Sequence, residues 1–193
     1  GRPSGGDHVV VLGAGGIGAF LVHAAARHGA EVTAVDLDAG RLAVAAALGA
    51  ERTVQTTSDL PLEEQLGELK PTVVYECTGF PPAAQAAVAT VERGGRVVVV
   101  GLHQNPVPVN LLSVSLDEKE LVGTLAHVLG ADLGHAIDLL EDGAALWERV
   151  APVVVPLDDV VTTGLQPMIE GGETPIKLLL DPHIDSPRQL RTV

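Results

Sequence analysis

The sequence predicts an α/β fold in which helices cover both faces of a parallel β-sheet. Short runs of apolar, mostly β-branched residues alternate along the chain with stretches whose apolar residues recur at the helical period. Hydrophobic residues make up 46% of the 193 residues but aromatic residues only 2%, so the core must consist of Val, Leu and Ala. Such a core suits strands that are buried on both faces between helices.

The alternation of strands and helices predicts right-handed connections and a doubly wound sheet. Gly29 and Gly49 directly follow two of the expected helices, as is typical of helix ends, and Asp38 is of a residue type favoured at an N-cap. The expected strands cover 8–12, 32–36, 52–54, 72–76, 96–100 and 120–123, and the expected helices cover 15–28, 38–48, 61–69, 82–91 and 132–140.

The C-terminal part departs from this rhythm. Strands are expected at 152–156 and 176–180, with a helical stretch at 158–170 that Pro167 interrupts. We therefore expect three parts, which are a main domain at 1–150, a strand–helix–strand segment at 151–183 and a polar, flexible tail at 184–193.

Composition and charge limit the class of function. The formal net charge of −13 disfavours a nucleic-acid partner, whose phosphates such a field would repel. A single cysteine, Cys77, allows no intrachain disulfide and favours a reducing, cytoplasmic environment. No apolar run reaches transmembrane length and the first residues lack the character of a signal peptide, so no membrane partner is expected.

A glycine-rich turn follows the first expected strand. Gly13-Ala14-Gly15-Gly16-Ile17-Gly18 fits the pattern G-x-G-x-x-G. In the dinucleotide-binding, or Rossmann, fold the first glycine makes the tight turn, the second lets the backbone approach a pyrophosphate, and the third lets the helix pack closely on the sheet. The start of the helix adds N–H donors and a partial positive charge. Taken alone, the pattern fits an ordinary glycine-rich turn equally well.

An acidic residue ends the second expected strand. Asp36 lies roughly 20 residues beyond the turn, where a carboxylate of the dinucleotide fold accepts the hydroxyls of the adenosine ribose. It would repel the 2′-phosphate of NADP, and the next residues, Leu37 and Asp38, offer no arginine for that phosphate. The sequence therefore predicts a Rossmann domain that prefers NAD, with a solvated strand end as the alternative interpretation of Asp36.

Further stretches extend the pattern beyond the turn. GGDHVVVLGAGGIG, AVDLDAGRLAVAAALGA and VVYECTGFPPAAQAAVATVERGGRVVVVGL cover the first, second, fourth and fifth expected strands, and KELVGT covers the sixth. Together they resemble the coenzyme-binding domain of the zinc-dependent medium-chain alcohol dehydrogenases. PLDDVVTTGLQPMIEGGETPIKLLLDP resembles the segment that returns to that family's catalytic domain, and GLHQNPVPVNLLSVSLDEKELVGTLAH is most similar to the butanediol and polyol (sorbitol-like) branch.

The resemblance implies a Rossmann doubly wound parallel six-stranded sheet that binds NAD. It places Ile17 at the pyrophosphate, Asp36 on the adenosine ribose and Arg41 against the adenine. From the residues alone, Arg41 also fits a solvated helix charge, and Val100 a core position. The resemblance further places residues 78–79 beneath the adenosine side, the backbone of 100–102 near the nicotinamide, and 124–126 on its carboxamide. The implied cofactor-binding residues are Gly13, Gly15, Gly16, Ile17, Gly18, Asp36, Arg41, Thr78, Gly79, Val100, Gly101, Leu102, Thr124, Leu125 and Ala126.

The catalytic chemistry of this family is expected outside the chain. The resemblance implies a zinc ion, held by Cys, His and Glu of a separate catalytic domain, that activates the alcohol. In this chain Cys77 stands alone, and His23 and His28 do not share a helix face. His127 and His135 are too far apart in sequence to indicate a site. We therefore expect no catalytic residue and no metal ligand here.

Two interpretations of the whole chain remain. The first is the NAD-binding domain of a zinc-dependent alcohol or polyol dehydrogenase, an oxidoreductase that transfers hydride between a secondary alcohol and NAD. In that case the separate chain is inactive, and a homodimer or homotetramer is expected. The second is a free-standing NAD-binding or sensing module without catalysis. The family-like C-terminal segment favours the first, because a free-standing sensor has no need for it.

Overall fold

The structure is a computed structural model that describes residues 1–67, 69–126, 128–143, 146–171 and 174–191. The chain forms two compact units, Gly1–Val128 and Leu129–Val193, and we describe each by itself. The division that the sequence suggests, at residues 150 and 183, stays a prediction.

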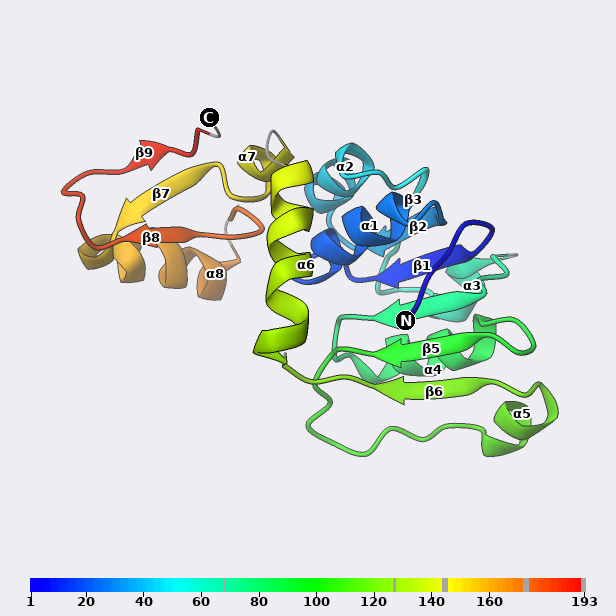
Figure 1. Cartoon of the computed structure of the whole chain (residues 1–193). Helices are drawn as coiled ribbons and strands as arrows, with labels where there is room; N and C mark the ends of the chain where they lie inside the picture. The colour runs from blue at the N-terminus through cyan, green and yellow to red at the C-terminus, as the bar shows by residue number, and fades with distance from the viewer. Residues whose placement is uncertain (68, 127, 144–145, 172–173, 192–193) are drawn as a thin grey trace. The chain divides into compact units, whose positions relative to one another are not determined.

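The first unit is built on a six-stranded parallel sheet with the strand order β3-β2-β1-β4-β5-β6 (Figure 1). This is the doubly wound order, in which the chain starts in the middle and reverses its direction of travel between β1 and β4. The predicted α/β fold is therefore confirmed. The strands are β1 (His8–Leu12), β2 (Glu31–Asp36), β3 (Arg52–Gln55), β4 (Val73–Glu76), β5 (Arg96–Val99) and β6 (Glu120–Gly123).

The core of this unit lies around the central strand β1. Each residue from Val9 to Leu12 is at most 1% exposed, because β1 pairs with β2 on one side and β4 on the other while helices cover both faces. Successive side chains of a strand point to opposite faces, so a strand in this position needs an apolar residue at every step. Small alanines of the helix after β4 (Ala83, Ala86 and Ala87) complete the packing.

The helices of the first unit begin and end close to the predicted places. They are α1 (Gly18–Arg27), α2 (Ala39–Ala47), α3 (Leu62–Leu66), α4 (Pro81–Thr90) and α5 (Leu111–Leu116). The N-cap prediction for Asp38 is confirmed, because its carboxylate accepts the backbone N–H of Arg41 at 2.9 Å. Helix α5 was not predicted. It is only six residues long, and its Leu112, Val114 and Leu116 alternate with serines, which is not the helical period. The Asn110 side chain caps it.

The second unit has its own small sheet. Its elements are α6 (Leu129–Asp142), α7 (Trp147–Val150), β7 (Val153–Pro156), α8 (Gln166–Glu170), β8 (Leu179–Asp181) and β9 (Arg188–Gln189). Strand β7 lies in the middle, parallel to β8 and antiparallel to β9. The helical stretch expected over 158–170 is divided into a 3₁₀ turn, a π-helical turn and α8, and Pro167 lies in the first turn of α8. Proline is tolerated there because it has no N–H to leave unpaired.

No helix in the described part of the chain is long and apolar enough to cross a membrane.

Candidate dinucleotide-binding site

The glycine turn connects β1 to α1 at the carboxyl end of the sheet. Gly13 adopts a φ of 92°, in the left-handed region that favours glycine, and its N–H donates to the carbonyl of Val35 at 2.8 Å. A Cβ on Gly18 would lie 1.8 Å from the carbonyl oxygen of Gly13. No side chain fits between these two backbones, so α1 can begin directly behind the strand only because Gly18 has none.

Asp36, the last residue of β2, holds the glycine turn by a side-chain contact. Its Oδ2 accepts the N–H of Ala14 at 2.8 Å, and its Oδ1 accepts the N–H of Asp38 at 3.0 Å. The carboxylate is thereby fixed between the turn and the start of α2. A carboxylate oxygen accepts more than one hydrogen bond, so both oxygens keep the capacity to accept ribose hydroxyls.

A pocket of about 710 Å³ opens beside these two features. It lies at the carboxyl ends of β1, β2 and β4, where ligands of open α/β sheets bind. Its walls are largely apolar and include hydroxyl and carboxyl groups. The lining residues are Leu12, Gly13, Gly15, Val35, Asp36, Leu37, Arg41, Thr56, Thr57, Ser58, Asp59, Leu60, Pro61, Leu62, Cys77, Thr78, Phe80, Pro82 and Ala83.

Sequence reasoning missed two walls of this pocket. Residues 56–62 follow β3, and Phe80 begins the approach to α4. Both segments lie at carboxyl ends of strands, which is the one signal that could have indicated them. Apart from Leu62, which begins α3, their apolar members lie on loops without a periodic pattern, so the sequence does not reveal that they face the same space.

Arg41 brings a positive charge to the glycine turn. A Cβ on Gly15 would lie 3.7 Å from Arg41 Nη1, so the guanidinium lies directly over the backbone of the turn. Both residues line the pocket. This position suits the neutralisation of a negative group at the turn; contact of Arg41 with an adenine stays a prediction.

Two further predicted segments are in direct backbone contact. A Cβ on Gly101, after β5, would lie 2.2 Å from the backbone nitrogen of Gly79, after β4. A Cβ on Gly79 would lie 2.8 Å from the carbonyl oxygen of Leu102. The structure thus brings residues 78–79 and 100–102 together at the carboxyl ends of β4 and β5.

The remaining predicted residues do not line the pocket. Ile17 is 55% exposed at the turn. Thr124 donates its N–H to Val99 at 3.2 Å, which places residues 124–126 beside the end of β5. Leu125 is 79% exposed, and Ala126 adopts a φ of 57°. Their assignment to a cofactor stays a prediction, as does that of the other site residues.

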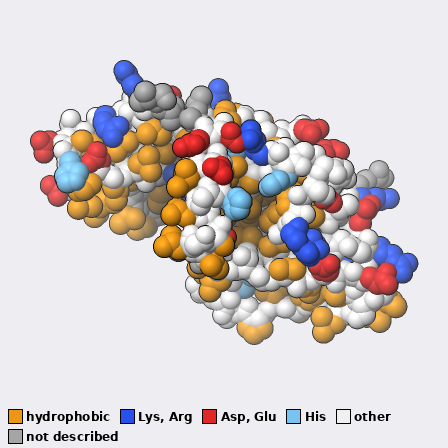
Figure 2. All heavy atoms as spheres, in the orientation of Figure 1, with side chains coloured by type: hydrophobic (Ala, Val, Ile, Leu, Met, Phe, Trp, Pro, Cys, Tyr) orange, Lys and Arg blue, Asp and Glu red, His pale blue; other side chains and the backbone are white. Residues whose placement is uncertain are grey.

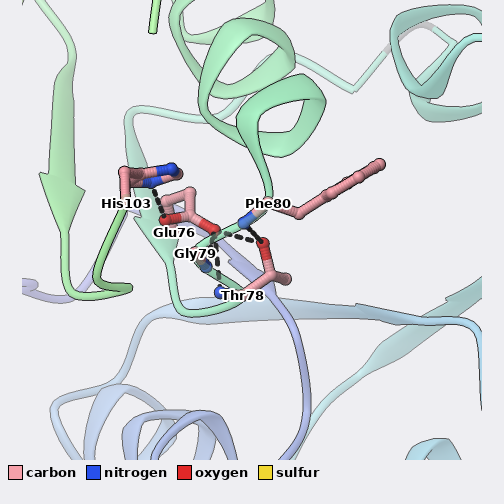
Figure 3. A network of polar contacts seen from close by, with 5 residues as sticks. All are labelled: Glu76, Thr78, Gly79, Phe80 and His103. Atoms are coloured by element: carbon pink, nitrogen blue, oxygen red, sulfur yellow. Dashed lines mark hydrogen bonds and ion pairs between the residues drawn. The ribbon is translucent and has the colours of Figure 1, made fainter. Parts of the chain in front are cut away.

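A buried carboxylate is the main feature of this region that sequence reasoning did not identify. Glu76, the last residue of β4, is 0% exposed and contacts Thr78, Gly79 and His103 (Figure 3). The only signal in the sequence is an acidic residue that ends an otherwise apolar strand. His103 lies on a loop after another strand, so no local pattern connects the two residues.

Cys77, the next residue, carries an unreactive thiol. Burial, and to a lesser extent the charge of Glu76, raises the pKa of Cys77 to about 12. A thiol must lose its proton to bind zinc or act as a nucleophile. Among the described residues no group of three or more His, Cys, Asp or Glu side chains could hold a metal ion; His127 lies outside them.

Comparison with known proteins identifies the family. Residues 16–142 match the family model described as zinc-binding dehydrogenase. This match covers more than half of the chain, and the chain belongs to that family.

Individual relatives agree with this assignment. The (R,R)-butanediol dehydrogenase of Neisseria gonorrhoeae is 26% identical over 183 residues, which are 93% of this chain and 51% of that protein. Human sorbitol dehydrogenase is 36% identical over 129 residues, 63% of this chain and 36% of that protein. The chain therefore spans about half, or less, of the length of these relatives.

A solved structure shows the same fold. An alcohol dehydrogenase from E. coli CFT073, complexed with NADH, superposes with a TM-score of 0.82 at 24% identity. The superposition covers 93% of this chain and 53% of the other.

Proposed function

We propose that this chain is the NAD-binding part of a zinc-dependent alcohol or polyol dehydrogenase, whose complete form transfers hydride between a secondary alcohol and NAD. The observation that carries the proposal is the position of Asp36. Its carboxylate is fixed by the N–H of Ala14 in the glycine turn, at the wall of a pocket of about 710 Å³. The family membership and the butanediol and sorbitol dehydrogenase relatives support it.

The residues of the turn fit the pyrophosphate of NAD. Apart from its chain neighbours, the only described atom within 4 Å of a Cβ on Gly15 would be Arg41 Nη1, at 3.7 Å. The backbone here faces open space, as a close approach of phosphate requires. The N–H groups at the start of α1 and the guanidinium of Arg41 both favour negative charge at this place.

The pocket walls fit the adenosine. Ribose hydroxyls would donate to Asp36, while Leu37, Leu60 and Phe80 supply apolar surface for the base. The nicotinamide, which accepts or donates the hydride, belongs to the other half of the sheet, because a doubly wound sheet takes one nucleotide on each side of its switch point. The carboxyl ends of β4, β5 and β6 form that half.

The described residues do not fit a catalytic zinc. They include no cluster of metal-ligating side chains, and the thiol of Cys77 keeps its proton. We assign no zinc-dependent step to this chain and place the catalytic domain of the complete enzyme outside it. The butanediol dehydrogenase relative aligns over 93% of the chain, which favours this interpretation over a free-standing sensing module. The single cysteine supports a cytoplasmic location.

The sixth strand supports a homodimer. β6 pairs only with β5 among the described strands and forms an edge of the sheet. Its Leu121 and Val122 are 42% and 36% exposed. Hydrophobic side chains are also visible along the margin of this unit where β6 and α5 lie (Figure 2). We infer that two copies pair their β6 edges about a twofold axis, the step from which a homotetramer would also be assembled.

Calorimetric titration with NADH and NADPH tests the cofactor site. We expect tighter binding of NADH, because Asp36 accepts ribose hydroxyls and repels a 2′-phosphate. Hydrogen bonds to a charged group contribute about 1.5–3 kcal/mol, so Asp36→Asn should weaken NADH binding about tenfold and narrow its advantage over NADPH. Glu31→Gln, at the opposite end of β2, is the control and should leave both affinities unchanged. Equal affinities in the unmodified chain would contradict the role of Asp36.

A further inference from the structure

Glu76 is the only buried carboxylate among the described residues, and it ends a strand whose other residues are Val73, Val74 and Tyr75. It ends β4, directly beside the switch point between β1 and β4, and it is 0% exposed. It does not line the adenosine-side pocket. A buried charge is retained only where donors compensate it, so its contacts indicate what it does.

The carboxylate connects the turn after β4 with the loop after β5. Its Oε1 accepts the N–H of Thr78 at 2.7 Å, the hydroxyl of the same residue, and the N–H of Gly79 at 3.0 Å. Its Oε2 lies 2.9 Å from Nε2 of His103. Figure 3 shows the carboxylate between the imidazole on one side and the turn at Thr78 and Gly79 on the other.

His103 depends on Glu76 for its orientation. The imidazole is only 12% exposed, and among the described residues its Nδ1 has no hydrogen-bond partner. Because the carboxylate accepts, Nε2 carries the proton of this contact. The contact with Glu76 is therefore the hydrogen bond that holds the ring within the described part of the chain.

The turn after β4 and the loop after β5 are also in close backbone contact. The main-chain carbonyl of Glu76 accepts the N–H groups of Val100 and Gly101, both at 2.8 Å. A Cβ on Gly101 would lie 2.7 Å from Glu76 Oε2 and 2.2 Å from the nitrogen of Gly79. Beyond this point the chain runs without helix or strand to α5. His103 is thus the side chain that ties the start of a long loop to the sheet.

We propose that Glu76 and His103 are a positioning pair for the nicotinamide half of the cofactor. This inference rests on the proposed function, in which the carboxyl ends of β4, β5 and β6 receive the nicotinamide. The pair holds the backbone of residues 100–102 against the turn at 78–79 and so fixes the surface on which the nicotinamide nucleotide lies. Neither side chain lines the adenosine-side pocket, and the pair acts through the backbone that it holds.

Two amide substitutions of His103 have similar polarity but differ in how far the donor nitrogen extends toward Glu76. The amide nitrogen of glutamine extends about as far as imidazole Nε2, whereas that of asparagine extends only as far as Nδ1. His103→Gln should therefore keep a donor on Glu76, and His103→Asn should lose it. Both variants are neutral and polar, which makes them a matched pair.

The probes are NADH and ADP-ribose, which lacks the nicotinamide. With the 193-residue chain, His103→Asn should raise the Kd for NADH about tenfold, equivalent to about one hydrogen bond to a charged group. The Kd for ADP-ribose should stay within about twofold of its original value, and the fluorescence of bound NADH should shift toward that of free NADH. His103→Gln should restore the NADH affinity and the emission.

Each outcome has one meaning. If His103→Asn weakens the binding of NADH and of ADP-ribose equally, or leaves the ratio of the two Kd values unchanged, the positioning role is overturned while the proposed function stands. Failure of the unmodified chain to bind either ligand overturns the proposed function itself. If circular dichroism shows that His103→Asn does not fold, Glu76→Gln is measured instead. That variant keeps an oxygen for Thr78 and Gly79, and without a selective loss of NADH affinity the inference is wrong.

Discussion

Two carboxylates, each at the last residue of a strand, organise the carboxyl edge of the first unit. Asp36 ends β2 and accepts the N–H groups of Ala14 and Asp38; Glu76 ends β4 and accepts those of Thr78 and Gly79. Where strands give way to turns, backbone donors lose their partners in the sheet, and a carboxylate satisfies several at once. Each half of the predicted cofactor site thus has its own acidic residue that fixes the surrounding backbone.

At the same scale, Cys77 gives a prediction about pH. Burial raises the pKa of its thiol from the ordinary 9.0 to about 12 in the folded chain. Because of this raised pKa, the folded chain keeps the thiol proton at pH values at which the unfolded chain releases it. The free energy of unfolding therefore falls as pH rises from about 9 toward 12. The contribution of this group should be about 1.4 kcal/mol smaller at pH 10 than at pH 8.

Urea unfolding of the chain and of Cys77→Ala at both pH values checks this. The alanine variant removes the thiol and should lose that part of the pH dependence. The raised pKa of Tyr75 is caused mainly by burial, which both proteins share, and only secondarily by the charge of Cys77, which the variant removes. A pH dependence that is the same in both proteins would show that the thiol of Cys77 titrates normally.

At the scale of elements, the predictable parts are those with a local cause. The buried strands are continuous apolar runs, and the bounds of β1 agree with the prediction because helices cover both of its faces. Helix α5 is short, and its apolar residues alternate with serines instead of recurring at the helical period. The contact of Glu76 with His103, and the pocket wall at 56–62, join loops that follow different strands. Such contacts follow from the order of the strands in the sheet, which a local pattern does not contain.

Two glycines of the element formed by β1, the glycine turn and α1 should have different roles, Gly18 in stability and Gly15 in binding. Gly18→Ala would place a Cβ 1.8 Å from the carbonyl oxygen of Gly13, so α1 must move from β1. We expect a loss of about 3 kcal/mol of stability, at the upper end of the usual overpacking cost. Gly15→Ala meets only the end of Arg41, at an ordinary contact distance of 3.7 Å, and should fold normally.

Gly15→Ala should impair the binding of NADH and not the stability of the fold. Its added methyl group occupies the space that the pyrophosphate needs, so Gly15→Ala should weaken NADH binding about tenfold at nearly unchanged stability. Thermal unfolding and calorimetry on both variants measure the two effects. Normal NADH affinity in Gly15→Ala would contradict a pyrophosphate at this turn.

At the scale of the whole molecule, charge and edges decide what the chain associates with. The net charge of −13 does not favour nucleic acid, and charged side chains of both signs are interspersed on the face seen in Figure 2. An open edge of a sheet is a template for another strand. In the first unit β3 and β6 are the two edges, and β6 carries the exposed apolar residues Leu121 and Val122.

The backbone of β6 shows how a second copy would attach. Glu120 donates its N–H to Gly95 at 2.9 Å and Thr124 donates to Val99 at 3.2 Å, both toward β5. Since N–H groups alternate in direction along a strand, those of Leu121 and Gly123 point to the open side. A twofold axis would set two β6 strands antiparallel, and these outward groups would form the hydrogen bonds between them.

Leu121→Pro tests this pairing because it removes one outward N–H and leaves the hydrogen bonds to β5 in place. Proline is tolerated on edge strands, so the variant should fold and sediment as a monomer in analytical ultracentrifugation, while the unmodified chain sediments as a dimer. Leu121→Ala shortens the side chain but keeps the N–H, and it should dimerise more weakly than the unmodified chain yet more strongly than the proline variant. If the dimer is equally stable in all three chains, the interface lies elsewhere, because the proposed pairing uses the outward N–H of Leu121.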